Sequence, residues 1–236
     1  NVIGFETDKK LLGGLAFNIM FQQGEQNETT KDKNGKTIPV DNSASGQKGN
    51  RDGFGDGVSA SLTYENKDMG LAAAVAANRA IASKFNAYSD LTGIYTDAVR
   101  VTGSLDLGAM GASGLVLGAL WQTAQPTDDT VTVTKGTPAV VTSYKGLQED
   151  AFGVTAAYKI GATPLKLKAQ YISAKSETDA AIIAGKKELK QDLYGVGADY
   201  QINKQAKFFG IVAQQKRDWL TKDDKKTNIG LGMEYN

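Results

Sequence analysis

Apolar and polar residues alternate over the last ten positions of the chain. Ile229, Leu231, Met233 and Tyr235 occupy one parity, whereas the other parity holds asparagine, glycine and glutamate. Because successive side chains of a strand point to opposite faces, this pattern predicts a strand with one face suited to hydrocarbon and the other to water. A tyrosine at the end of the apolar row suits the headgroup zone of a membrane. We interpret the segment as the closing strand of a transmembrane β-barrel.

The same period-two alternation recurs in ten earlier segments. The predicted strands span residues 2–7, 12–23, 57–66, 69–79, 95–107, 112–124, 150–160, 164–175, 189–201, 206–216 and 227–236. The clearest example is 164–175, where leucine alternates with lysine. In 206–216 the adjacent Phe208 and Phe209 leave the outward face undecided. The chain is therefore predicted to be all-β, an antiparallel transmembrane barrel with about eleven strands.

The connections between these strands alternate in length. Short turns follow the first, third, fifth, seventh and ninth strands, and long polar segments follow the others, at residues 24–56, 80–94, 125–149, 176–188 and 217–226. Short turns on one rim and long loops on the other are typical of outer-membrane barrels. Residues 130–133 and 139–142 predict a small hairpin within one long segment.

Eleven is an odd number, so the first and last strands run in the same direction. Two such neighbours would be parallel, and the sheet cannot close by antiparallel pairing within residues 1–236. We therefore expect a single barrel domain over 1–236, incomplete at its N-terminal side and preceded by further strands.

Composition excludes several other classes of protein. The longest stretch without strongly polar residues, 69–77, is about half of the roughly 20 residues that a membrane helix needs. The chain has no histidine and no cysteine, which removes the usual general base and the usual soft metal ligands. Its net charge of +1 gives no basic field for nucleic acid. We expect no enzyme activity, cofactor, metal site or nucleic-acid partner.

The polar parity supplies the candidate functional residues. These predicted pore-lining side chains are Arg100, Lys166, Lys168, Lys216, Glu6, Glu65, Asp106, Asp199 and Glu234. In a water-filled pore such charges stay hydrated and bias which ions pass. The alternative is that most are solvated wall residues with little influence. Arg100, Lys166 and Lys168 lie mid-strand and favour anions, although the wall as a whole is nearly balanced.

Aromatic residues on the apolar parity lie mostly toward strand ends. The predicted girdle comprises Tyr64, Trp121, Tyr158, Tyr171, Tyr200 and Tyr235. Strand ends suit rings at the two membrane interfaces, whereas the alternative is a core buried between two sheets of a soluble sandwich.

Several segments resemble the Gram-negative general porins. They are residues 1–7, 12–17, 153–158, 194–200 and 229–236. In that family the strand similar to 1–7 is the sixth of sixteen, so the resemblance implies that the chain corresponds to about strands 6 to 16. It also implies a homotrimer in outer-membrane lipid. The family usually ends in phenylalanine, whereas this sequence stops at Asn236, and the family's constriction loop has no counterpart here.

The leading hypothesis is an outer-membrane porin, a water-filled channel for passive diffusion of ions and small hydrophilic solutes. A substrate-selective porin and an outer-membrane adhesin or structural barrel acting through its long loops remain open. A soluble β-sandwich would require protein to cover the outward Leu, Val and Phe residues.

Overall fold

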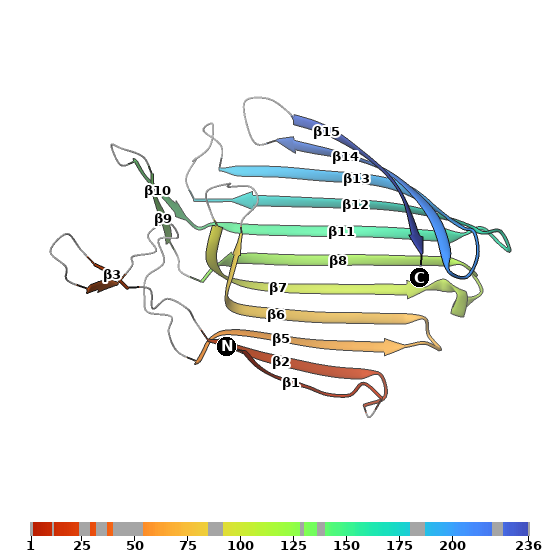
Figure 1. Cartoon of the computed structure of the whole chain (residues 1–236), viewed down its shortest axis with the longest axis horizontal. Coiled ribbons are helices and arrows are strands. Elements are labelled where there is room, and N and C mark those ends of the chain that lie inside the picture. The colour runs from red at the N-terminus through yellow and green to blue at the C-terminus, as the bar shows by residue number, and fades with distance from the viewer. Residues whose placement is uncertain are drawn as a thin grey trace.

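The structure is a computed structural model, and it describes residues 2–10, 12–23, 29–31, 37–39, 54–84, 92–127, 130–135, 140–179, 187–218 and 224–235. Eleven strands form one curved antiparallel sheet in chain order (Figure 1). They are β1 Val2–Glu6, β2 Leu15–Gln23, β5 Phe54–Asn66, β6 Leu71–Lys84, β7 Thr92–Asp106, β8 Leu115–Pro126, β11 Gln148–Lys159, β12 Leu165–Glu177, β13 Glu188–Gln201, β14 Ala206–Asp218 and β15 Asp224–Tyr235. The sheet is open, with β1 and β15 at its edges. All eleven predicted strands are confirmed.

Two small hairpins lie outside the main sheet. β3 Thr29–Lys31 pairs with β4 Thr37–Pro39, and β9 Thr130–Lys135 pairs with β10 Val140–Lys145. β9 and β10 lie at the end of the sheet that carries the long connections (Figure 1). This pairing confirms the predicted hairpin, whose central residues 136–139 lie outside the described residues.

The strands run further into the long connections than the alternation predicts. β6 continues to Lys84 and β7 starts at Thr92, whereas the predicted ends were 79 and 95. A bulge shifts the register between Asn78 and Ile81, and Ala80 in this bulge has a φ of 54°. The backbone N–H of Ala80 donates to a carboxylate oxygen of Asp97 at 2.9 Å. Because a bulge inserts an extra residue, it breaks the period-two pattern while pairing continues.

The short turns at the other rim depend on glycine. Gly14 and Gly70 have φ values of 95° and 65°. Their carbonyl oxygens accept hydrogen bonds from the backbone N–H groups of Glu65 at 2.9 Å and Asp106 at 2.7 Å. A Cβ atom at either glycine would collide with the carbonyl oxygen of that same partner. Only glycine therefore allows these turns to extend the hydrogen-bond ladder to the adjacent strand. A 3-10 turn, η1 Leu107–Met110, joins β7 to β8.

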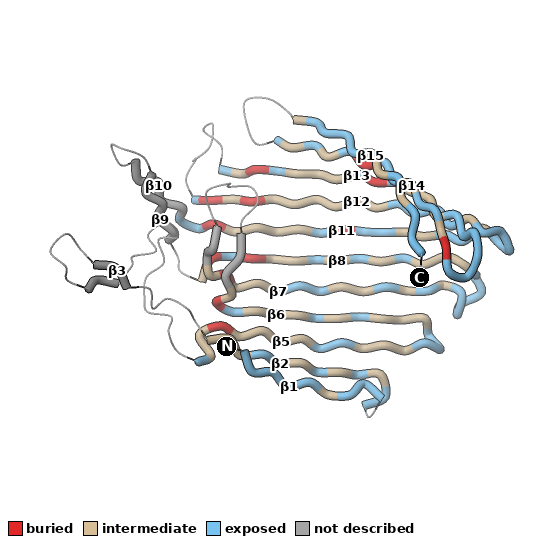
Figure 2. Tube along the Cα trace, viewed as in Figure 1, coloured by how far each residue is buried: buried red, intermediate tan, exposed pale blue. Residues whose placement is uncertain are grey.

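Almost no hydrophobic core exists within the described part of the chain. Its buried hydrophobic residues are Ala80, Ala124, Leu147, Leu189, Ala206 and Ala213. In contrast, Leu231 is 85% exposed, Ile229 is 73% exposed and Val196 is 60% exposed. Figure 2 shows exposed and intermediate residues along the whole sheet, with few buried positions. The described strands form one layer, so the soluble sandwich interpretation is wrong.

Cross-strand pairing defines two faces of the sheet. We call the face that carries Leu62, Val196 and Leu231 the apolar face, and the opposite face the polar face. The register also decides the ambiguous pair in β14. Phe208 lies opposite Met233 on the apolar face, whereas Phe209 lies opposite Gly232 on the polar face. Among the described residues, no helix is long and apolar enough to cross a membrane.

Candidate functional site

Eight of the nine predicted pore-lining residues share the polar face. The register places them there on strands β1, β5, β7, β12, β13 and β15: Glu6, Glu65, Arg100, Asp106, Lys166, Lys168, Asp199 and Glu234. Strand pairing thus places these side chains on one face of the sheet, although Glu6 and Glu234 lie on its two opposite edge strands.

Lys216 is the exception, and its predicted placement is wrong. It pairs with Asp192 in β13, two positions from Tyr194, so it lies on the apolar face. Its ammonium nitrogen stands 5.3 Å from the centroid of the Tyr194 ring. A cation over an aromatic face is held by the ring quadrupole. Lys216 therefore belongs to the aromatic surface near the long connections and not to the polar face.

Ion pairs offset much of the charge on the polar face. Lys168 contacts Asp199 at 2.6 Å and Lys207 contacts Glu234 at 2.8 Å. Arg100 donates from Nε to the Gln122 side-chain oxygen at 2.7 Å, which leaves its charge without a carboxylate partner in the described residues. Exposed pairs of this kind contribute about 0–1 kcal/mol each, so they set local charge more than stability.

At the short-turn rim, Lys9 and Glu65 form a further exposed pair at 2.6 Å. The hydrogen bond to the Glu65 carboxylate, followed by its negative charge, raises the pKa of Lys9 above its usual range. Lys9 lies in the turn between β1 and β2 and was not among the predicted site residues.

An uncompensated basic cluster lies on β11 and β12. Lys159 and Lys166 are cross-strand neighbours on the polar face, and both are exposed. Neither has an ion-pair partner among the described residues, and Lys168 lies two residues from Lys166. Lys159 was missed by sequence reasoning, although its parity within β11 matches that of the other polar-face residues. By contrast, β1, β5 and β7 carry the acids Glu6, Glu65 and Asp106 on this face.

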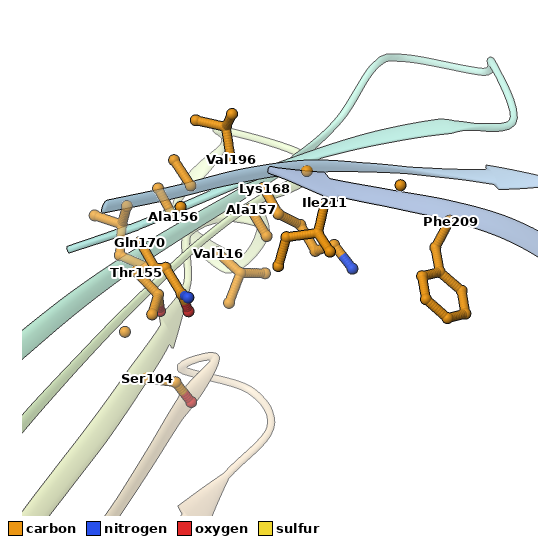
Figure 3. A pocket seen from close by; sticks show the side chains of 16 residues that line it. Ser104, Val116, Thr155, Ala156, Ala157, Lys168, Gln170, Val196, Phe209 and Ile211 are labelled. Atoms are coloured by element: carbon orange, nitrogen blue, oxygen red, sulfur yellow. The ribbon is translucent and has the colours of Figure 1, made fainter. Parts of the chain in front are cut away.

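A cavity of about 470 Å³ lies on the polar face beside this cluster. Its apolar lining includes Val116, Phe209 and Ile211, and its polar lining includes Thr155 and Lys168. Figure 3 shows Phe209 and Ile211 on one side of the strands, with Val196 pointing to the other. The polar face therefore also carries large apolar side chains.

Glycines explain how large apolar residues fit on this wall. A Cβ atom at Gly230 would lie 3.0 Å from a methyl group of Ile211, and one at Gly232 would collide with the Phe209 ring. Each glycine is the direct cross-strand partner of the large residue. The side chains therefore lie flat over neighbouring backbone instead of projecting from the sheet.

All six predicted girdle residues lie on the apolar face. Tyr64, Tyr158, Tyr200 and Tyr235 are near the short turns, and Trp121 and Tyr171 are nearer the long connections.

The second group also contains Phe152, and Tyr194, which was not predicted to belong to the girdle. The Phe152 and Tyr171 rings meet edge to face with centroids 5.7 Å apart, and Tyr171 and Tyr194 are 4.9 Å apart. The Tyr171 hydroxyl donates to Asp192 at 3.0 Å, so its polar end points toward the long-connection rim.

The described residues contain no group of three or more His, Cys, Asp or Glu side chains that could hold a metal ion. The arrangement offers instead a charged face, an apolar face and two aromatic rows, one near each rim.

Comparison with solved structures agrees with this architecture. The fold is similar to an anion-selective porin from Comamonas acidovorans, with a TM-score of 0.61, 14% identity, and coverage of 100% of this chain and 59% of that one. It is also similar to the outer membrane channel DcaP of Acinetobacter baumannii, with a TM-score of 0.59, 13% identity, and coverage of 99% and 61%. A third similar structure is OmpT of Vibrio cholerae in its trimer form, with a TM-score of 0.54 and 18% identity. The match covers 99% of this chain and 63% of that one. At these identities the likeness establishes the fold.

The chain spans about three-fifths of the length of these structures. No curated protein matches it by sequence. The profile of the Gram-negative porins does match, over residues 2–220, which is most of the chain. The chain belongs to the Gram-negative porin family.

Proposed function

We propose that the protein forms a water-filled channel in the bacterial outer membrane, through which ions and small hydrophilic solutes diffuse passively. The observation that carries this proposal is the division of a single-layered sheet into two faces. Most exposed Leu, Val and Ile side chains occupy the apolar face, and the predicted charges, Lys216 excepted, occupy the polar face. A bilayer accepts the first face and an aqueous lumen accepts the second.

In this arrangement the aromatic residues of the apolar face lie at the two membrane interfaces. Tyrosine and tryptophan are favoured there because the ring is apolar and the hydroxyl or indole N–H remains hydrated. The ordering of Tyr171 by Asp192 supports this role on the long-connection side.

Planar-bilayer conductance of the purified full-length protein tests the channel directly. We expect discrete steps whose current rises linearly with voltage in potassium chloride. A bilayer that contains the folded protein, shown by heat-dependent electrophoretic mobility, and yet stays insulating would refute the proposal. We further propose a homotrimer, by analogy with the trimeric OmpT, and native electrophoresis with chemical cross-linking measures this.

We also infer a preference for anions, which rests on Lys159 and Lys166. Their charges have no partner among the described residues, so they attract anions to this part of the wall. In a salt gradient, the reversal potential of the wild type should indicate anion preference, and Lys159→Gln with Lys166→Gln should move it toward the cation side. An unchanged reversal potential would contradict this role. The protein is proposed to carry out no chemical reaction.

A further inference from the structure

The cavity on the polar face combines features that a simple hydrophilic wall does not need. It lies along one row of cross-strand neighbours and beside a second row, of which Phe209 alone lines it. The first row contains Val116, Ala157, Lys168, Gly197 and Ile211, and the second contains Lys159, Lys166, Asp199 and Phe209. An apolar surface and a group of lysines are therefore adjacent on the same wall.

The apolar part is shaped by small residues between larger ones. Val116 and Ile211 stand at its two sides, and Ala157, Lys168 and Gly197 lie in that order between them. A Cβ atom at Gly197 would lie 2.8 Å from the carbonyl oxygen of Gly210, so the floor cannot rise there without moving backbone. The result is a shallow apolar depression of about 470 Å³, with room for a small ring or short alkyl chain.

The adjacent charges leave a net positive site. Asp199 is paired with Lys168 at 2.6 Å, which offsets one positive charge. The charges of Lys159 and Lys166 remain, on exposed side chains directly across from each other. Beside the apolar floor there are thus two ammonium groups that can bind one carboxylate.

We propose that this cavity is a solute-binding subsite for small organic carboxylates with an apolar body, such as aryl- or alkyl-carboxylates. The apolar body lies on Ile211 and Phe209, and the carboxylate contacts Lys166 and Lys159. Thr155 and Gln170 at the opposite margin can bond to polar substituents. This inference rests on the proposed channel and names a solute class for it. Because passage requires release, binding is expected to be on the order of millimolar.

The test is block of the ion current in planar bilayers, using the full-length protein and 3-phenylpropanoate as the probe. Acetate has the charge without the ring, and 3-phenylpropan-1-ol has the ring without the charge. We expect saturable block by 3-phenylpropanoate and a half-blocking concentration about tenfold higher for either control compound. Equal block by acetate, or equal block by the alcohol, would overturn the proposal.

Two variants locate the apolar contact. Ile211→Thr removes apolar surface inside the cavity, whereas Ile172→Thr makes the same change on the polar face of β12 but outside the lining. The half-blocking concentration should rise about fivefold for Ile211→Thr and stay unchanged for Ile172→Thr. The same shift in both would show that the site is not where we place it.

A second pair addresses the charge and does not depend on a packed residue. Lys166→Gln should weaken the block about fivefold, whereas Lys226→Gln, on the same face of β15 opposite Gln215, should not. Loss of block in both would indicate a general field and would overturn the subsite. A wild-type protein that fails to conduct at all refutes the channel itself, whereas a conducting channel without selective block refutes this inference alone.

Discussion

Val196 offers the most direct test that lipid covers the apolar face. It lies near the middle of β13, between Tyr194 and Tyr200, and is 60% exposed. Its cross-strand neighbours are Ala169 and Val212. Val196→Arg would place a cation on the apolar face between the two aromatic rows, where the proposed bilayer is hydrocarbon. On the lipid face of a barrel this change lowers the free energy of unfolding by about 2–4 kcal/mol.

Gln170→Arg is the matched control. Gln170 is adjacent in sequence to Ala169, the partner of Val196, but it lies on the polar face opposite Gly195. An arginine there is at nearly the same depth and remains hydrated in the proposed lumen. Its effect should stay within about 0.5 kcal/mol, as for an ordinary surface substitution.

Equilibrium urea unfolding of the full-length protein in phospholipid vesicles measures both variants. With a slope of about 1–3 kcal/mol/M, the midpoint of Val196→Arg should fall by about 1–2 M, and that of Gln170→Arg by far less. If the two midpoints fall equally, or if only Gln170→Arg is destabilised, the assignment of the faces is wrong.

Three further predictions concern packing, the girdle and charge. Gly232→Ala should destabilise the barrel by about 1–3 kcal/mol because its methyl group collides with Phe209, and adding Phe209→Ala should remove the penalty in a double-mutant cycle by urea unfolding. In urea unfolding, Tyr200→Ala should lower the free energy of unfolding by about 1–2 kcal/mol, whereas Tyr200→Trp should leave it nearly unchanged. An equal decrease in both variants would exclude an interfacial role for Tyr200. Because Glu65 raises the pKa of Lys9, the stabilisation from this pair is complete below the usual lysine pKa of about 10.4 and is lost as pH rises through the raised value. Glu65→Gln should return the pKa of Lys9 to its usual range in an NMR titration, and an unchanged pKa would exclude the pair.

The sequence predicts the strands well because lipid and water impose a strict period of two. The alternation of apolar and polar residues is visible within each strand alone, so a strand can be predicted without knowing which strands pair with it. The segments that escaped prediction lie at the long-connection ends, where the bulge at Ala80 changes the parity. In these segments the backbone still pairs with the neighbouring strand, but the side chains no longer alternate with a period of two.

It is harder to predict which side chains of a strand lie on the apolar face than to predict that the strand exists. In β14, Phe208 and Phe209 are both large and apolar, so alternation within this strand does not decide between them. Pairing with β13 and β15 decides it, and the same pairing moves Lys216 to the apolar face beside Tyr194. A charged residue beyond the aromatic row is no longer in hydrocarbon, which is why charge alone misplaced it.

The apolar residues of the polar face were missed for a non-local reason. Ile211 and Phe209 are acceptable on a wetted wall because their cross-strand partners are Gly230 and Gly232, over which they lie flat. Gln170 lies over Gly195 in the same way. No single strand contains the information for such a pair.

These pairs have a consequence for the proposed pore. The distance that a side chain projects from the wall depends on its partner as much as on its own size. A substituent on the glycine leaves the large residue no room against the backbone, so it must rise toward the lumen. The width of the channel at a given height is therefore set by cross-strand pairs, and a small-to-large change at a glycine narrows the pore through its neighbour.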